Sequence, residues 1–159
     1  MVNELLTRQR LILLAAGGSA AMLLSAWAFQ YIGGLAPCTM CIWQRWPHAA
    51  AAVIGLPALA VAGPLLPLLG ALAAATTGGI GIYHTGVERN WWQGPTTCTS
   101  GGVEGLSPQE LMDQIMAAPL VQCDQVAWEM FGLSMASWNA VVSFGLAAIW
   151  ILAMRKRAG

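Results

Sequence analysis

Four cysteines are the residues of this sequence best suited to chemistry, and they fall into two pairs. Cys38 and Cys41 form a Cys-x-x-Cys motif, whereas Cys98 and Cys123 bracket residues 99–122. Thiols exchange disulfides through their thiolate form, so the surroundings of each pair decide what it can do. Four cysteines allow three pairings, and their spacing alone does not choose among the three.

The first pair is placed for redox chemistry. Pro37 precedes the motif and an apolar run follows it, so we expect Cys38 and Cys41 to open a helix. A helix N-terminus stabilises anions and so favours a thiolate. Arg45 lies one helical turn beyond Cys41 on the same face, and its guanidinium favours a thiolate further. We predict a redox-active pair with Arg45 beside it.

Other uses of the motif fit less well. A c-type haem site needs a histidine after the second cysteine, and Ile42 stands there. Zinc would want a second close pair of ligands, whereas Cys98 and Cys123 are far apart in the sequence. A static crosslink is the remaining alternative, although a Cys-x-x-Cys disulfide closes a very small loop and constrains little. We predict no metal site.

For Cys98 and Cys123 a structural disulfide is the ordinary interpretation, because loops outside the cytoplasm often carry one. Closing this loop would contribute about 3.5 kcal/mol on a chain-entropy argument. A helical membrane core would not depend on that contribution, so the bond could open and close without unfolding the protein. Structural and catalytic roles both stay open for this pair.

The composition is that of a membrane protein. Hydrophobic residues make up 57% of the 159 positions and charged residues only 9%, against about 25% charged in soluble domains. Eight Trp and 18 Gly agree with this, because Trp favours the membrane interface and Gly is common in spanning helices. No basic patch with interleaved aromatic residues is present, so we expect no nucleic-acid partner.

Four apolar runs are long enough to cross a bilayer, which takes about 20 residues. We expect one integral-membrane domain over residues 1–159, and we expect the first run to stay as a span because it is longer than a signal-peptide core. Gly63-Pro64 predicts the turn between the second and third spans. The expected spans cover about residues 11–31, 43–62, 66–87 and 133–154.

Basic residues flank the first and last spans and set the expected orientation. By the positive-inside rule both termini are cytoplasmic, and the protein crosses the membrane several times. Segments at about 32–41 and 89–130 then face outward and carry all four cysteines. The expected fold is all-α: an antiparallel four-helix transmembrane bundle with a long periplasmic loop between helices 3 and 4. The basic residues used are Arg8, Arg10, Arg155, Lys156 and Arg157.

The long loop contains one helix signal. Ser107-Pro108-Gln109-Glu110 has the pattern of a capping box with Pro in the first turn. The amphipathic helix that follows either lies on the outer membrane surface or packs on the loop itself.

Several single residues have ordinary structural interpretations. We expect packing or an interfacial position for His48, the water boundary for Glu88 and Arg89, and the aromatic belt for Trp91, Trp92 and Trp138, with Trp91 and Trp92 also able to touch a ligand.

Across nearly its whole length the sequence resembles the disulfide bond formation protein B (DsbB) family. The resemblance rests on four segments, which are Pro37-Cys38-Thr39-Met40-Cys41-Ile42-Trp43-Gln44-Arg45, Tyr83-His84-Thr85-Gly86-Val87-Glu88, Gly94-Pro95-Thr96-Thr97-Cys98, and Cys123-Asp124 with Trp128, Phe131-Gly132-Leu133-Ser134-Met135 and Trp138. Residues between Cys98 and Cys123 match only loosely.

The resemblance implies a function and a location: a quinone-reducing protein-disulfide oxidoreductase of the bacterial inner membrane, which reoxidises a periplasmic DsbA-like oxidase. The protein would so join electron transport to assisted protein folding. It implies that Cys38 and Cys41 reduce the quinone, with Cys41 as the thiolate beside the ring. It implies that the partner attacks Cys98 and that Cys123 completes this second pair.

Two residues are implied as cofactor ligands. Arg45 would bind the quinone together with Cys41, and His84 would be a neighbour of the quinone site. Ubiquinone and menaquinone remain equal choices.

Two other functions compete with this one. A membrane scaffold with two structural disulfides would carry no electrons. A vitamin K epoxide reductase-like protein would share the four-helix arrangement, but that family usually places its Cys-x-x-Cys near a late helix, unlike Cys38–Cys41.

Overall fold

The computed structural model describes residues 7–96, 98–99, 107–117 and 121–156. These described residues form four long helices, one short helix and one two-stranded hairpin. In chain order the elements are α2 (Arg8–Tyr31), α3 (Thr39–Ala60), α4 (Leu65–Glu88), α5 (Pro108–Ala117), β1 (Glu129–Met130), β2 (Leu133–Ser134) and α6 (Met135–Arg155).

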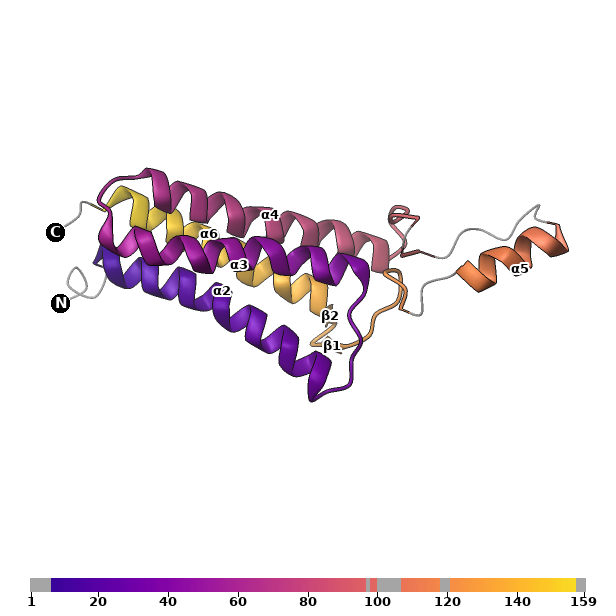
Figure 1. Ribbon diagram of the computed structural model, residues 1–159. Helices are drawn as coiled ribbons and strands as arrows, with labels where there is room; N and C mark the ends of the chain where they lie inside the picture. Colours follow the sequence, from indigo (N-terminus) through magenta and orange to yellow (C-terminus); the bar gives the residue numbers. More distant parts are fainter. Residues whose placement is uncertain (1–6, 97, 100–106, 118–120, 157–159) are drawn as a thin grey trace.

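The four long helices lie side by side and alternate in direction (Figure 1). α3 packs between α2 and α4, and α6 packs between the same two helices, so the four form a closed ring. The start of α2, the α3–α4 turn and the end of α6 share one end of the bundle. The start of α3, the end of α4 and the hairpin share the other end, and the cysteines lie there.

Three of the described helices are long and apolar enough to cross a membrane, namely α2, α4 and α6. α3 is not among the three, and it carries Gln44, Arg45 and His48 in its first half. The chain is therefore mostly helical with several candidate membrane spans. These polar residues of α3 line the cavity described below.

Small residues on α4 allow α6 to approach closely. Trp150 of α6 is fully buried and lies over Gly70, where an added Cβ would meet the indole at 2.5 Å. Gly81 faces the α6 backbone, because a Cβ added at this position would lie 3.0 Å from the Ala136 carbonyl oxygen. Close helix packing through small residues is a common arrangement in membranes. The buried apolar cluster here consists of Leu11, Ile12, Ala15, Ala58, Ala71, Ala74, Leu146, Ala147, Trp150 and Ala153.

Arg8 is not a solvated flanking charge, because its side chain is buried. One guanidinium nitrogen donates to the Ala58 carbonyl at 3.0 Å, and another donates to the Val61 and Gly63 carbonyls at 3.1 Å each. These carbonyls end α3 and form the turn into α4, where no intrahelical N–H remains to satisfy them. Arg8 therefore joins the start of α2 to that turn.

The capping box predicted in the long loop is confirmed. Ser107 Oγ accepts from the Glu110 backbone N–H at 3.4 Å, and Glu110 Oε2 accepts from the Ser107 N–H at 2.8 Å. These hydrogen bonds lower the pKa of the Glu110 carboxyl. Of the expected outer segment 89–130, residues 97, 100–106 and 118–120 lie outside the described part of the chain, as does Arg157 near the C-terminus.

The hairpin was not predicted. β1 and β2 pair antiparallel, with Glu129 opposite Ser134 and Met130 opposite Leu133. The two turn residues, Phe131 and Gly132, both have positive φ, at 55° and 74°, as a tight two-residue hairpin turn requires. Ser134 then caps α6 by accepting from the Ser137 N–H. The hairpin thus fixes where α6 begins.

Candidate functional site

Cys38 is the N-cap of α3, as the position of the motif before an apolar run indicated. Its Sγ accepts a hydrogen bond from the Cys41 backbone N–H at 3.2 Å, which satisfies one of the free donors at the helix start. Cys38 and Cys41 are both free, with their sulfur atoms 2.7 Å apart. The motif is therefore a dithiol that lies at the N-terminus of α3, the positive end of the helix dipole.

Cys98 and Cys123 form a disulfide, with Cα atoms 5.3 Å apart. Both residues are fully buried, and the Cys123 N–H donates to the Cys98 carbonyl at 2.6 Å. They pack in one apolar cluster with Cys38, Met40 and Val87. The loop that follows α4 is thus held directly against the start of α3.

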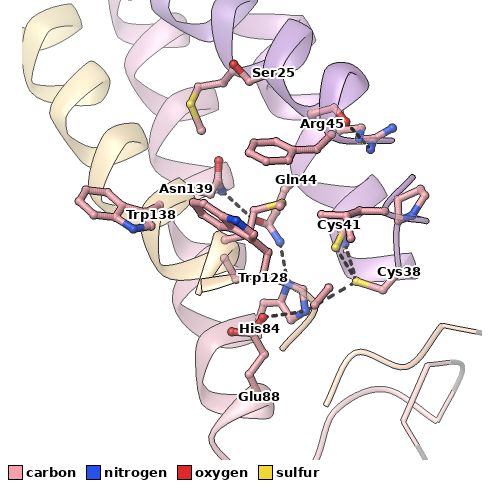
Figure 2. A pocket seen from close by; sticks show the side chains of 18 of the residues that line it. Ser25, Cys38, Cys41, Gln44, Arg45, His84, Glu88, Trp128, Trp138 and Asn139 are labelled. Carbon is pink, nitrogen blue, oxygen red and sulfur yellow. Dashed lines mark hydrogen bonds and ion pairs between the residues drawn. The ribbon is translucent and has the colours of Figure 1, made fainter. Parts of the chain in front are cut away.

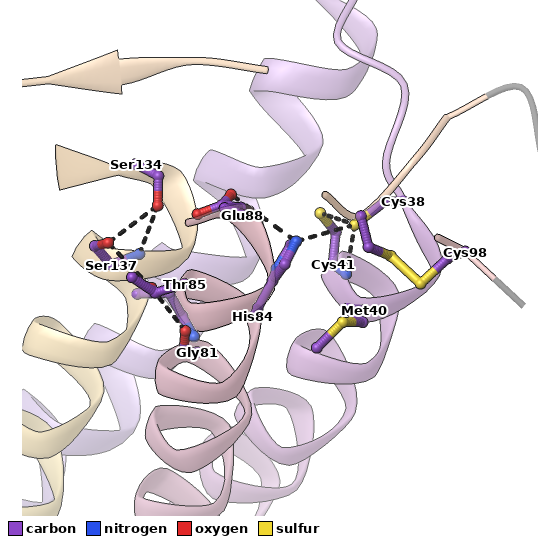
Figure 3. Close-up of polar contacts among 12 residues, drawn as sticks. Cys38, Met40, Cys41, Gly81, His84, Thr85, Glu88, Cys98, Ser134 and Ser137 are labelled. Atoms are coloured by element: carbon purple, nitrogen blue, oxygen red, sulfur yellow. Dashed lines mark hydrogen bonds and ion pairs between the residues drawn. A yellow bond between two sulfur atoms is a disulfide. The ribbon is translucent and has the colours of Figure 1, made fainter. Parts of the chain in front are cut away.

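The two cysteine pairs meet at Cys38. Its Sγ, a ring nitrogen of His84 and the Cys123 Sγ all lie within 4.8 Å of one another. Cys38 at the N-cap of α3 and His84 of α4 lie side by side (Figure 3), and the loop after α5 contributes Cys123. Because the Cys123 sulfur is held in the disulfide, these three residues do not offer three metal ligands in this redox form. The contact instead suits exchange between the two pairs.

Cys38 is the protonated partner of its pair. Its hydrogen bond to the Cys41 side chain, together with burial, raises the pKa of the Cys38 thiol well above its usual range. The raised pKa favours Cys38 as the donor and Cys41 as the acceptor of the hydrogen bond between the two sulfur atoms. This assigns the roles of donor and acceptor within the motif.

His84 lies beside Cys38 and is almost fully buried. Its Nε2 is 3.6 Å from the Cys38 Sγ and 3.9 Å from Glu88 Oε1 (Figure 3). The Glu88 side chain is only 5% exposed, so it faces the site and not the solvent, whereas the neighbouring Arg89 is exposed. The α4 turn that carries His84 and Glu88 is covered by the loop and the hairpin, which the sequence did not predict.

A cavity of about 370 Å³ opens beside Cys41. Its walls are largely apolar, and its few polar groups include the side chains of Arg45, Gln44, His84 and Asn139 (Figure 2). All four long helices and the segment before the hairpin contribute to it. A cavity of this size, apolar with a few polar groups, is typical of a site for a small ligand.

Arg45 lies against α2 and lines this cavity. It donates to Gln30 Oε1 at 2.7 Å and to the Ala26 carbonyl at 3.4 Å. Its Nε is buried and has no hydrogen-bond partner among the described residues. The guanidinium is thus fixed by α2, while one donor remains available for a ligand.

Sequence reasoning missed several residues of the site. Gln44, Asn139, Glu88 and Trp128 line the cavity, and Trp138 lines it too instead of lying only in the aromatic belt. Trp91 and Trp92 are not among the lining residues; they pack edge to face against each other, and Trp92 stacks on Tyr83. His48 is buried and hydrogen-bonded to Asn139, in line with the packing role expected for it.

Comparison with known proteins identifies the family of this chain. The family model described as "Disulfide bond formation protein DsbB" matches residues 8–153. Disulfide bond formation protein B of Pasteurella multocida is 34% identical over 133 residues, which cover 78% of this chain and 74% of that protein. The protein of the same name from Albidiferax ferrireducens is 32% identical over 142 residues, or 86% and 80% of the two chains.

A third relative with that name, from Xanthomonas oryzae pv. oryzae, is 32% identical over 134 residues, or 79% and 77% of the two chains. No solved structure matches the chain significantly. The matched family region contains all four cysteines, the residues that line the cavity, and the four long helices except the last two residues of α6. By this match and by these relatives, the chain belongs to the DsbB family of disulfide-forming membrane enzymes.

Proposed function

We propose that this protein is a thiol–disulfide oxidoreductase that reoxidises a periplasmic DsbA-type dithiol oxidase and passes the electrons to a membrane quinone. One observation carries the proposal: Cys41 and Arg45 open on an apolar cavity, while Cys38 of the same motif faces the second cysteine pair. Such a motif can receive electrons at Cys38 from the second cysteine pair and release them at Cys41 to an acceptor in the cavity.

The electrons would enter at the loop pair. A thiolate of the reduced partner attacks Cys98, the bond to Cys123 breaks, and the electron pair of that bond stays on Cys123. The partner's second thiol then closes the partner's own disulfide and frees Cys98. Cys123, which lies next to Cys38, attacks the oxidised motif at Cys38 and leaves Cys41 as a thiolate. Attack of Cys98 on Cys123 then restores the loop disulfide and leaves the motif as the dithiol present here.

The cavity fits a quinone as electron acceptor. Its apolar walls suit the ring, and the unpartnered Arg45 Nε offers a donor to a carbonyl oxygen. A quinone bound there would take two electrons and two protons from the dithiol and leave the Cys38–Cys41 disulfide. Cys38, as the protonated thiol, holds one of those protons close to the motif.

The same proposal places the protein in the bacterial inner membrane. α3 would join α2, α4 and α6 as a fourth span, its polar residues turned to the cavity rather than to lipid. Basic residues at the start of α2 and the end of α6 favour a cytoplasmic position for that end of the bundle. The cysteine end, with the long loop, would then face the periplasm.

Quinone reduction by the purified protein tests the proposal. The full-length protein in detergent is mixed with a reduced thioredoxin-like periplasmic oxidase, and ubiquinone and menaquinone analogues are followed separately by ultraviolet absorbance. We expect reduction by the natural chain and none by Cys41→Ser. Ser19→Ala, which changes a buried hydroxyl away from the cavity, should leave the rate unchanged.

Two results would overturn the assignment. Full turnover by Cys41→Ser would remove Cys41 from the electron path. No reduction of either quinone by folded natural protein would favour a scaffold with a structural disulfide, or a different acceptor.

A further inference from the structure

A chain of buried hydrogen bonds crosses the bundle beneath the cysteine motif, and it links α6 to His84 on α4 through Gln44 on α3 (Figure 2). Asn139 Nδ2 donates to Gln44 Oε1 at 2.7 Å, and Gln44 Nε2 lies 3.0 Å from His84 Nδ1. All three side chains are at least nine-tenths buried. Polar groups in a membrane bundle are costly, so such a chain invites a functional explanation.

The direction of each hydrogen bond in the chain is fixed by backbone carbonyls, which only accept. The Asn139 amide nitrogen also donates to the Thr77 carbonyl at 3.3 Å, so its oxygen must point the other way, toward His48. The Gln44 amide nitrogen donates to the Met40 carbonyl at 3.2 Å, so its second hydrogen points at His84. Neither amide can be turned round without losing a backbone acceptor.

This orientation selects one tautomer of His84. Because Gln44 donates to Nδ1, that nitrogen carries the lone pair, and the ring proton of the neutral imidazole is on Nε2. Nε2 is the nitrogen that faces the Cys38 Sγ, at 3.6 Å. His84 therefore presents an N–H donor, not a lone pair, to the sulfur at which the two cysteine pairs meet.

We propose that His84 is a catalytic hydrogen-bond donor to the Cys38 sulfur when that sulfur carries negative charge, and that Gln44 and Asn139 are positioning residues that hold the ring proton on Nε2. This rests on the proposed function, in which Cys38 exchanges with Cys123. In the step concerned, a Cys98 thiolate attacks Cys123 in a Cys38–Cys123 disulfide. The Cys98–Cys123 bond forms, the Cys38–Cys123 bond breaks, and its electron pair remains on Cys38, where the His84 N–H stabilises it.

Other charged groups near this contact are present in every variant compared below. Glu88 faces Nε2 from the next turn of α4, at 3.9 Å, and Arg45 lies in the cavity beyond Cys41. The remaining titratable neighbour, Cys41, is replaced by serine throughout the test. Differences among the variants therefore report on His84 and on the residues that position it.

The first experiment measures Cys38 alone. In the full-length Cys41→Ser protein with the Cys98–Cys123 disulfide intact, Cys38 is the one free thiol, and its rate of reaction with iodoacetamide is followed from pH 6 to pH 11. We expect His84→Leu to move the midpoint up by about one pH unit, which is about a tenfold loss of thiolate at a given lower pH. His84→Gln, whose amide keeps an N–H donor near the Nε2 position but cannot take up a proton, should stay within about threefold of the parent.

Equal midpoints for the parent protein and for its His84→Leu and His84→Gln variants would overturn the proposal. A Gln substitution as damaging as Leu would also overturn it, because that result indicates a general base rather than a donor.

The second experiment tests the positioning residues. Asn139→Leu removes the donor that holds the Gln44 oxygen, so the Met40 carbonyl alone still fixes the Gln44 amide, which then turns its oxygen toward Nδ1 more readily. A Gln44 oxygen at Nδ1 draws the ring proton away from Nε2, so the Cys38 midpoint should rise. Added to His84→Gln, the same change should have no effect, because an amide has no tautomer to select. Ser143→Ala is the matched control: Ser143 contacts Asn139 and His48 on the far side and touches neither Gln44 nor His84.

An equal effect of Asn139→Leu with His84 and with His84→Gln would indicate loosened packing. That result would overturn the positioning role of the hydrogen-bond chain. Quinone reduction by the natural protein, measured in parallel, distinguishes failure of this inference from failure of the proposed function. Loss of the His84 effect with normal quinone reduction removes this inference alone. A normal His84 effect without quinone reduction removes the proposed function instead.

Discussion

At the scale of single residues, the start of α3 divides two tasks between two sulfur atoms three positions apart. Cys38 is buried and faces the disulfide, whereas Cys41 is half-buried and lines the cavity. The sequence predicted that the motif opens a helix, and this is confirmed by the N-cap at Cys38. It did not predict which sulfur faces which neighbour, because that depends on how α3 is rotated against α4.

Alkylation should distinguish the two sulfur atoms. The pKa of Cys38 is raised by its hydrogen bond to Cys41 and by burial, so Cys38 stays protonated and unreactive at neutral pH and gains thiolate only in strongly alkaline solution. We expect iodoacetamide at about pH 7 to modify Cys41 at least about tenfold faster than Cys38, as measured by peptide mass spectrometry at short times. Preferential labelling of Cys38 would contradict this assignment.

Arg45 should act on binding of the acceptor. Its unpartnered Nε can donate to a ligand, and a hydrogen bond from a charged group contributes about 1.5–3 kcal/mol. We expect Arg45→Leu to raise the KM for quinone by about 10- to 100-fold. Gln30→Leu, which removes only the α2 acceptor of the guanidinium, should have a smaller effect. A KM unchanged in Arg45→Leu would place the quinone elsewhere.

At the scale of elements, the packing of α6 on α4 depends on glycines that differ in what surrounds them. An added Cβ at Gly70 would overlap the buried Trp150 ring, whereas one at Gly79 would meet nothing within 4 Å. We expect Gly70→Ala to lower the free energy of unfolding by about 1–3 kcal/mol. Gly79→Ala should be neutral or stabilising by up to about 1 kcal/mol. Denaturation in mixed micelles measures both, and equal effects would contradict the packing described.

Apolar runs and turn residues were sufficient to predict long helices, the turn after α3 and the capping box of α5. They were not sufficient for the polar interior. Gln44 and Asn139 lie in helices with no strong amphipathic pattern, so the sequence does not show which face is inside. Their burial becomes visible only when α3, α4 and α6 are placed together. Glu88 was missed for the same reason, since the loop that covers it has no periodic pattern.

At the scale of the whole molecule, the Cys98–Cys123 disulfide, which the proposed partner would attack, is completely buried. The loop must therefore open before an external thiolate reaches Cys98. We expect the rate of reduction of this bond by dithiothreitol to reach a plateau as the reductant concentration increases, because opening becomes limiting. A rate that stays proportional to concentration up to high values would show that the sulfur atoms are accessible without opening.

The contact between Arg8 and the α3–α4 turn has a consequence for synthesis of the chain. The three carbonyls that Arg8 binds belong to residues 50, 53 and 55 positions later. When α2 leaves the ribosome, its arginine has no acceptors within the protein and must remain hydrated at the membrane surface, where the charge prevents α2 from sliding into the lipid. Emergence of the turn then supplies the carbonyls and takes the charge out of water. One side chain thus holds α2 in place while the protein is incomplete, and joins it to the α3–α4 turn once that turn exists.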